Sequence, residues 1–285
     1  MTLVIKEIIC KSALAKCGFP GGGLAINPYV GCGHNCAYCY ARFIKRFTGH
    51  CEKWGSFVDA RINVVEVLRK QLRSKKIKPH EQIYLGTVTD PYQPLEAKYK
   101  LTRKILEVLK DYKFSVSILT KSDLVLRDID LLRQFKNLDV NFTITTLDEK
   151  WRFLVEPGAV SIVKRLKAAK KLHEAGINVL AMVGPYWPFF TEPDKLFKEF
   201  KKSGIRHVFS ESFNTTGGNF NEVEQIIKKN YPKLLQQMKV VLFDKDKFAI
   251  FYQEARQKLM AASRKFAIPV TVYFGRGHAA KFKKV

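Results

Sequence analysis

Residues 31–40 read Gly-Cys-Gly-His-Asn-Cys-Ala-Tyr-Cys-Tyr and place Cys32, Cys36 and Cys39 in a C-x3-C-x2-C spacing. Thiolates grouped in one short loop are typical ligands of zinc or of an iron–sulfur cluster. Structural zinc usually takes four ligands, often from two C-x2-C pairs, and the sequence contains no second pair. A [4Fe–4S] cluster also takes four ligands, but one of its irons can lack a cysteine and bind a small molecule instead. The spacing therefore favours an open cluster, with zinc or a chance grouping of buried thiols as alternatives.

The same loop resembles the signature of the radical S-adenosylmethionine (SAM) superfamily, which has an aromatic residue before the last cysteine, here Tyr38. The resemblance implies that Cys32, Cys36 and Cys39 bind a [4Fe–4S] cluster whose open iron binds the amino and carboxylate groups of SAM. It also implies that the reduced cluster splits SAM into methionine and a 5′-deoxyadenosyl radical. The expected protein is a radical SAM enzyme that abstracts hydrogen from a substrate.

The chain of 285 residues suits one large domain or two small ones, and 46% hydrophobic residues suffice for a sizeable core. No apolar run approaches the roughly 20 residues that cross a bilayer, and the N-terminus lacks the pattern of a signal peptide. We therefore expect a cytoplasmic protein without a membrane partner, a setting that also keeps thiols reduced. Cys10, Cys17 and Cys51 share no C-x2-C spacing and are predicted to be ordinary thiols.

The chain is strongly basic. Lys and Arg total 50 against 26 acidic residues, a formal charge of +24. The lysine-rich surfaces of proteins from hot environments balance Lys with Glu, and this chain does not. The excess predicts a polyanionic partner, most simply nucleic acid. Paired lysines recur along the sequence at Lys75-Lys76, Lys170-Lys171, Lys201-Lys202 and Lys228-Lys229, with a further run at Lys281-Phe-Lys283-Lys284.

Apolar and amphipathic segments alternate over most of the chain. Six strand-like segments separated by helices predict an α/β fold with a parallel sheet and right-handed crossovers. Alternation alone does not distinguish an open doubly wound sheet from a barrel. The superfamily resemblance implies a partial (β/α)6 barrel of the TIM type, with its site at the C-terminal ends of the strands. The strands are expected at 24–27, 82–86, 115–120, 140–145, 178–183 and 206–210, and the helices at 61–74, 101–112, 127–135, 160–175 and 193–203.

Three regions are expected. An N-terminal segment, 1–23, ends in a glycine-rich loop, and the radical SAM partial barrel occupies 24–212. A C-terminal extension, 213–285, closes the open side of the barrel or covers the substrate. Within this extension we expect a loop at 215–219, helices at 221–230 and 245–266, and a strand at 269–274.

Polar residues after the second and third strands are candidates for binding SAM. Thr89 or Asp90 stands where many radical SAM enzymes accept the amino group of SAM, although Asp90 before Pro91 is also typical of a plain loop cap. Lys121 follows the third strand, where a cation could hold the carboxylate.

The fourth strand carries a polar row, Asn141, Thr143 and Thr145, opposite the apolar Phe142 and Ile144. A central strand of a helix-covered parallel sheet has no solvent face. The polar row therefore indicates a barrel lumen that holds a polar ligand.

Several further segments together resemble the family related to spore photoproduct lyase, often labelled DNA repair photolyase. This resemblance implies SAM contacts from Thr89, Lys121 and a fourth-strand hydroxyl, either Thr143 or Thr145. Glu156 and Arg165 are predicted to be structural. The segments are Asn27-Pro-Tyr-Val-Gly-Cys32, Cys36-Ala-Tyr-Cys-Tyr-Ala-Arg42, Thr89-Asp-Pro-Tyr-Gln-Pro94, Leu101-Thr-Arg103, Leu119-Thr-Lys-Ser122, Arg127-Asp128, Glu156-Pro157 and Glu174-Ala-Gly176.

The resemblance also implies that Tyr38 and Tyr40 match tyrosines that relay a hydrogen atom in the lyase. One departure matters: this chain has Thr87 where the lyase has a cysteine hydrogen donor. We expect nucleic acid as partner and an electron donor such as ferredoxin or flavodoxin. The alternatives are modification of a peptide, tRNA or small metabolite, or a non-catalytic metal-containing protein that binds nucleic acid.

Overall fold

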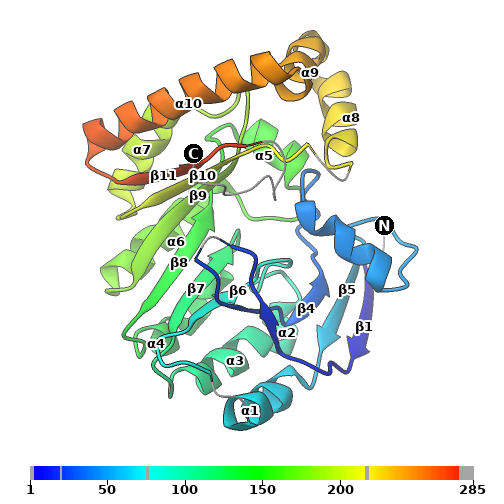
Figure 1. Cartoon of the computed structure of the whole chain (residues 1–285), viewed down its shortest axis with the longest axis vertical. Helices are drawn as coiled ribbons and strands as arrows, with labels where there is room; N and C mark the ends of the chain where they lie inside the picture. Colours follow the sequence, from blue (N-terminus) through cyan, green and yellow to red (C-terminus); the bar gives the residue numbers. More distant parts are fainter. Residues whose placement is uncertain (1–2, 20, 75–76, 216–217, 276–285) are drawn as a thin grey trace.

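The computed structural model describes residues 3–19, 21–74, 77–215 and 218–275, and its centre is a curved eight-stranded sheet (Figure 1). Neighbouring strands pair parallel from β3 to β11, and only β2 runs antiparallel to its neighbour. The six predicted strands are β3 and β6 to β10, so the predicted α/β parallel sheet is confirmed. In spatial order the strands are β11 (Val270–Tyr273), β10 (Val208–Ser212), β9 (Asn178–Tyr186), β8 (Leu138–Thr143), β7 (Ser115–Thr120), β6 (Gln82–Leu85), β3 (Leu24–Ile26) and β2 (Leu14–Lys16).

Helices follow the strands along the chain and cover the outer side of the curved sheet (Figure 1). In α6 the buried residues Ile162, Ala168, Ala169 and Leu172 recur on one face, which is the pattern of a helix packed on a core. The helix ends at Glu174, and Gly176 follows with a φ of +82°, the left-handed conformation that glycine adopts freely. Along this part of the chain the helices are α1 (Val64–Ser74), α2 (Glu96–Tyr99), α3 (Leu101–Leu109), α4 (Ile129–Leu132), α5 (Glu149–Val155), α6 (Ile162–Glu174) and α7 (Pro193–Lys202), with 3-10 helices η1 (Tyr40–Phe47), which contacts the small-sheet strand β4, and η2 (Asp123–Asp128).

Several predicted boundaries were wrong by two or more residues; the strand expected at 206–210, for example, runs from Val208 to Ser212. The helix expected at 61–74 begins at Val64, because Arg61 still belongs to a strand, β5 (Phe57–Arg61). The helix expected at 127–135 is instead η2 followed by the four-residue α4. The strand expected at 140–145 is shifted two residues toward the N-terminus, so Thr145 lies beyond the end of β8.

A second, three-stranded sheet was not predicted. It consists of β1 (Val4–Ile8), β5 and β4 (Tyr29–Gly31), with β1 parallel and β4 antiparallel to β5 (Figure 1). The chain passes from β3 in the large sheet to β4 in the small one and then enters the cysteine loop. The loop is therefore anchored at its start by both sheets.

The C-terminal part contains α8 (Phe220–Asn230), η3 (Pro232–Leu234), α9 (Leu235–Phe243), α10 (Lys245–Phe266) and β11. The long helix α10 packs against α7, and β11 extends the sheet beyond β10 (Figure 1). Part of the loop expected at 215–219 and two of the basic groups, Lys75-Lys76 and Lys281-Phe-Lys283-Lys284, lie outside the described residues. Within the described part of the chain, no helix is long and apolar enough to cross a membrane.

Candidate functional site

The three cysteines line one cavity of about 130 Å³, which we call the cysteine cavity. Its other walls come from the C-terminal ends of β6 to β10, as expected for a barrel of this type. Of the residues predicted from the sequence, the cavity brings together Cys32, Cys36, Cys39, Tyr38, Tyr40, Thr89, Asp90, Lys121 and Thr143, and it also includes Thr87. Thr145 does not line it; the Thr145 carbonyl instead accepts a hydrogen bond of 2.7 Å from the hydroxyl of Thr191.

Hydrogen bonds from two distant loops hold the cysteine loop. The Thr89 hydroxyl donates to the carbonyl of Gly31 at 2.6 Å and accepts from the side chain of Gln93 at 3.0 Å. Gln93 Oε1 also accepts from the backbone N–H of Gly33 at 2.8 Å. On the other side, the Gly158 N–H donates to the carbonyl of His34 at 3.0 Å, and a Cβ at Gly158 would lie 2.2 Å from the Gly33 carbonyl oxygen. The loop has little room to change its shape.

The chemistry of these thiols fits a cationic metal group. None of the three cysteines is in a disulfide. Burial raises the pKa of all three thiols, that of Cys32 to about 12, and Lys121 opposes this rise at Cys36 and Cys39. Bound iron would supply the charge that stabilises buried thiolates. Among the described residues, no three His, Cys, Asp or Glu side chains lie close enough together to bind a single metal ion. A [4Fe–4S] cluster is larger than one ion, and each of its cysteine ligands binds a different iron.

Asp90 caps the loop after β6. Its carboxylate accepts from the hydroxyl of Thr120 at 2.7 Å, from the N–H of Tyr92 at 2.9 Å and from the N–H of Lys121 at 2.7 Å. His34 Nδ1 lies 3.1 Å from Asp90 Oδ2 but outside hydrogen-bond geometry. Burial alone would raise the pKa of Asp90, but His34 and Lys121 outweigh it and bring the pKa to about 2. The carboxylate therefore joins the ends of two strands.

Lys121 presents a cation to the cysteine cavity. Its Nζ lies 5.7 Å from the centre of the Tyr38 ring. Burial would lower the pKa of Lys121, but Cys36, Glu156 and Asp90 together raise it. The ammonium form is therefore retained, and it is suited to hold an anionic group.

Tyr38 is supported from behind by a buried ion pair. Its hydroxyl donates to Glu156, and Glu156 pairs with Arg165, both side chains being 1% exposed. Arg165 also donates to the carbonyl of Thr143 at 2.9 Å, which connects the pair to the end of β8. The ring of Tyr38 packs edge-on against Trp187 with centroids 5.3 Å apart. Glu156 and Arg165 thus fix the position of Tyr38.

Tyr40 and Thr87 meet at the wall of the cavity. The Tyr40 hydroxyl donates to the Thr87 carbonyl, and the Thr87 hydroxyl accepts from the side-chain amide of Asn27 at 3.0 Å. Gly86, just before Thr87, has a φ of +86°, and a Cβ there would lie 2.3 Å from the ring of Pro91. This strand end therefore requires glycine.

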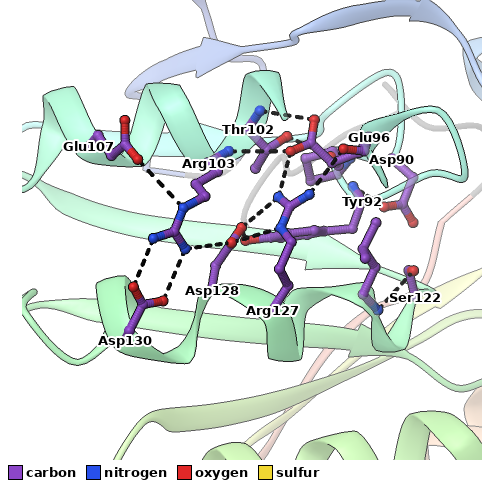
Figure 2. A network of polar contacts seen from close by, with 12 residues as sticks. Asp90, Tyr92, Glu96, Thr102, Arg103, Glu107, Ser122, Arg127, Asp128 and Asp130 are labelled. Atoms are coloured by element: carbon purple, nitrogen blue, oxygen red, sulfur yellow. Dashed lines mark hydrogen bonds and ion pairs between the residues drawn. The ribbon is translucent and has the colours of Figure 1, made fainter. Parts of the chain in front are cut away.

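A buried network of four charges supports the loop that carries Thr89 and Asp90. Figure 2 shows Arg127 between Glu96 and Asp128, at 2.7 and 2.8 Å, and Arg103 bonded to Asp128 at 2.9 Å. Both Glu96 and Asp128 are fully buried. Asp128 also accepts from the hydroxyl of Tyr92 at 3.0 Å. Sequence reasoning did not predict this network, although Arg103, Arg127 and Asp128 lay in segments that carried the family resemblance.

Asp128→Asn is expected to destabilise the protein by about 3 kcal/mol, because it leaves two partly buried guanidinium groups without a full counter-charge. Urea denaturation of the two proteins measures this difference. Asp130→Asn is the matched control, since Asp130 also bonds Arg103 but is 62% exposed, and we expect a midpoint close to that of the parent there. Equal midpoints for the Asp128 variant and the parent would contradict the prediction.

A second cavity of about 300 Å³ lies inside the curve of the sheet, and we call it the lumen cavity. It adjoins the cysteine cavity, with which it shares six lining residues, Phe19, Gly86, Thr87, Leu119, Met182 and Glu211. Asn141 of the predicted polar row lines it, and Asp139 and Glu211 were not predicted. Glu211 could not have been identified from the sequence, because it is a single charged residue in a short strand.

Comparisons with known proteins agree with this architecture. The model of the Radical SAM superfamily matches residues 26–200. A protein of uncharacterized function from Methanocaldococcus jannaschii is 35% identical over 80% of this chain and 84% of its own length. A radical SAM Nalpha-GlyT isomerase of Pseudomonas phage M6 is 25% identical over 64% of this chain and 38% of its own length. A solved structure of a spore photoproduct lyase mutant with dinucleoside spore photoproduct superposes with a TM-score of 0.69 at 19% identity, covering 96% of this chain and 82% of the other.

Proposed function

The chain belongs to the radical SAM superfamily, and we propose that it is a radical SAM enzyme whose substrate is a nucleic acid. The family implies a [4Fe–4S] cluster and SAM, which together supply a 5′-deoxyadenosyl radical when bound. The observation that carries the proposal is one cavity that gathers three free thiols, a lysine ammonium and polar strand ends.

Each wall of the cysteine cavity has a role in the proposal. Cys32, Cys36 and Cys39 hold the cluster. Lys121 binds the carboxylate of SAM, and Thr143 provides a hydroxyl at the end of β8. The amino group of SAM is assigned to the wall formed by Thr89 and Asp90, whose side chains already bond the cysteine loop and the end of β7.

Tyr38 and Tyr40 flank the last cysteine and are proposed to relay a hydrogen atom. Both hydroxyls are hydrogen-bonded, Tyr38 to Glu156 and Tyr40 to the Thr87 carbonyl. Burial raises the pKa of both phenols, so each keeps the proton that a relay of neutral hydrogen atoms needs.

Lys121→Ala is expected to weaken SAM binding by roughly 1–3 kcal/mol, which is the loss of one hydrogen bond to a charged group. Equilibrium binding to the anaerobically reconstituted protein measures the effect, and the iron content shows whether the cluster is retained. Lys201→Ala is the control, because Lys201 is exposed on α7. Parent-like SAM affinity in an iron-loaded Lys121 variant would move the carboxylate site elsewhere.

Two features support a nucleic acid as substrate. The first is the charge of +24. The second lies on η1, directly after the cysteine loop, where Phe43 and Phe47 are 44% and 74% exposed. The guanidinium of Arg46 lies 5.7 and 5.0 Å from the centres of these two rings. Exposed aromatic rings beside a cation are typical of surfaces on which unpaired bases stack.

The parent protein is not expected to repair spore photoproduct by the lyase's route. The product radical must be quenched by a hydrogen atom, and Thr87 offers a hydroxyl, whose O–H bond is stronger than a thiol S–H bond, where the resemblance places the donor. Thr87 lines both cavities, which supports its assignment to the position of the hydrogen donor. The test is thymine recovery from DNA that contains the cross-linked dimer, for the parent and for Thr87→Cys.

Partial rescue of thymine recovery by Thr87→Cys would support the assignment of Thr87. The exposed Cys51 is the nearest alternative donor in sequence, and Cys51→Ala tests it. Clean repair by the parent that survives Cys51→Ala would refute the prediction.

A further inference from the structure

The lumen cavity adjoins the cysteine cavity, with which it shares lining residues, but differs from it in charge. Its volume of about 300 Å³ is at the lower end of the range of small-molecule sites, roughly 300–1,000 Å³. Its described lining contains Asp139 and Glu211 but no Lys or Arg, although the chain has a net charge of +24. Phosphate groups are therefore not suited to this cavity, whereas a group that donates hydrogen bonds is.

One acceptor in this cavity has no partner among the described residues. Asn141 donates through Nδ2 to the Ser117 hydroxyl at 3.0 Å and to Asp139 at 2.5 Å. Ser117 in turn donates to the same Asp139 oxygen at 2.7 Å. These bonds fix which end of the amide is Nδ2, so the unpartnered atom is the oxygen Oδ1, in a residue that is only 7% exposed. A buried acceptor left unpaired is costly, and a ligand N–H would remove that cost.

Two carboxyl groups, those of Asp139 and Glu211, are further hydrogen-bond acceptors on the wall of the lumen cavity. Burial raises the pKa of Asp139 to about 6, although Ser117 and Asn141 oppose the rise. Burial also raises the pKa of Glu211 to about 7. Ligand N–H groups that bond a carboxylate favour its charged form.

Aromatic side chains give the cavity flat walls. Tyr84 lies edge-on to Phe19 with centroids 5.1 Å apart, and Phe209 is stacked with Tyr273 at 6.5 Å. All four residues line the cavity. Bases removed from a stack are bound in proteins by aromatic side chains and by hydrogen bonds to the base edges.

We infer that the lumen cavity binds a nucleobase that carries an amino group, with Asn141 and Asp139 as its hydrogen-bond acceptors. This inference rests on the proposed nucleic-acid function and specifies which base enters. Carboxylates accept from the amino group of cytosine, and two acceptors side by side disfavour the carbonyl that uracil and thymine present at the same position. The cavity therefore selects against the base of the spore photoproduct.

Cytidine and uridine test this selection, because they share the ribose and the ring size and differ at position 4, where cytosine has an amino group and uracil a carbonyl, and at N3, where cytosine has an acceptor and uracil an N–H. Calorimetric titration of the full-length reconstituted protein is expected to give about ten-fold tighter binding of cytidine. Asp139→Asn keeps the size of the side chain and an acceptor for Ser117 and Asn141, and it is expected to reduce the preference to three-fold or less. Glu211→Gln provides a second variant, on β10, if Asp139→Asn does not fold. Asp111→Asn, at an exposed position outside the cavity, should keep the parent preference.

Equal or tighter binding of uridine would overturn the inference, as would a preference for cytidine that survives both cavity variants. Benzylamine tests whether the cavity binds an aliphatic amine, rather than the amino group of a nucleobase, as its hydrogen-bond donor. If benzylamine binding depends on Asp139 and cytidine binding does not, the nucleobase assignment is wrong. Salt-dependent binding of oligonucleotides is measured separately. If it persists while the nucleosides show no selectivity, the lumen assignment fails and the nucleic-acid function stands.

Discussion

The Cys32→Ala, Cys36→Ala, Cys39→Ala triple variant is expected to lose essentially all of its iron and sulfide and all release of 5′-deoxyadenosine from SAM. The parent protein should hold about four irons and four sulfides per chain after anaerobic reconstitution, because each cysteine binds one iron of a [4Fe–4S] cluster. Iron and sulfide analysis, together with 5′-deoxyadenosine release after reduction with dithionite, measures both effects.

The remaining three cysteines provide a matched control. The Cys10→Ala, Cys17→Ala, Cys51→Ala variant removes as many thiols and should keep its cluster, because none of these residues carries the C-x3-C-x2-C spacing and Cys51 is exposed. Stoichiometric zinc in the parent, or an intact cluster after loss of Cys32, Cys36 and Cys39, would contradict the assignment.

The second large effect concerns salt. Affinity for a duplex oligonucleotide should fall about a thousand-fold between 50 and 200 mM salt if six or more phosphates are neutralised, and affinity for a single strand somewhat less, because each contact releases condensed counterions. The formal charge of +24 makes so many contacts feasible. Fluorescence anisotropy at several salt concentrations measures the slope of affinity against salt.

Two variants on η1 separate charge from stacking. Arg46→Ala should lower the salt slope by about one, because it removes one cation. Phe47→Ala should weaken binding by roughly 1–3 kcal/mol with the slope unchanged, because stacking releases no counterions. Absence of binding even at 50 mM salt would direct the search for the substrate to a peptide or a small metabolite.

The sequence alone was sufficient where the signal is local. The cysteine spacing, with Tyr38 beside the last ligand, depends on a few adjacent residues, and the match of residues 26–200 to the Radical SAM superfamily agrees with it. The helix expected at 160–175 was likewise found as α6, in which buried residues repeat every three to four residues along one face. The parallel pairing of β6 to β10 agrees with the parallel sheet predicted from their alternation with helices.

The tertiary structure decided what depends on pairs of residues far apart in the chain. Strands as short as β4 show no measurable period, so the small sheet that anchors the cysteine loop left no pattern in the sequence. From the sequence, Thr89 or Asp90 was interpreted as a SAM ligand, with a loop cap as the alternative for Asp90. Only the structure showed that Asp90 accepts a hydrogen bond from the N–H of Lys121 and that Thr89 donates one to the carbonyl of Gly31, so that both residues connect separate segments of the chain. Asp139 and Glu211 come from β8 and β10, with β9 between them. Curvature of the sheet brings them to one cavity. The alternation of side chains along a strand determines which face of the sheet each residue occupies, but the residues of other strands that it meets across the lumen depend on how the whole sheet curves.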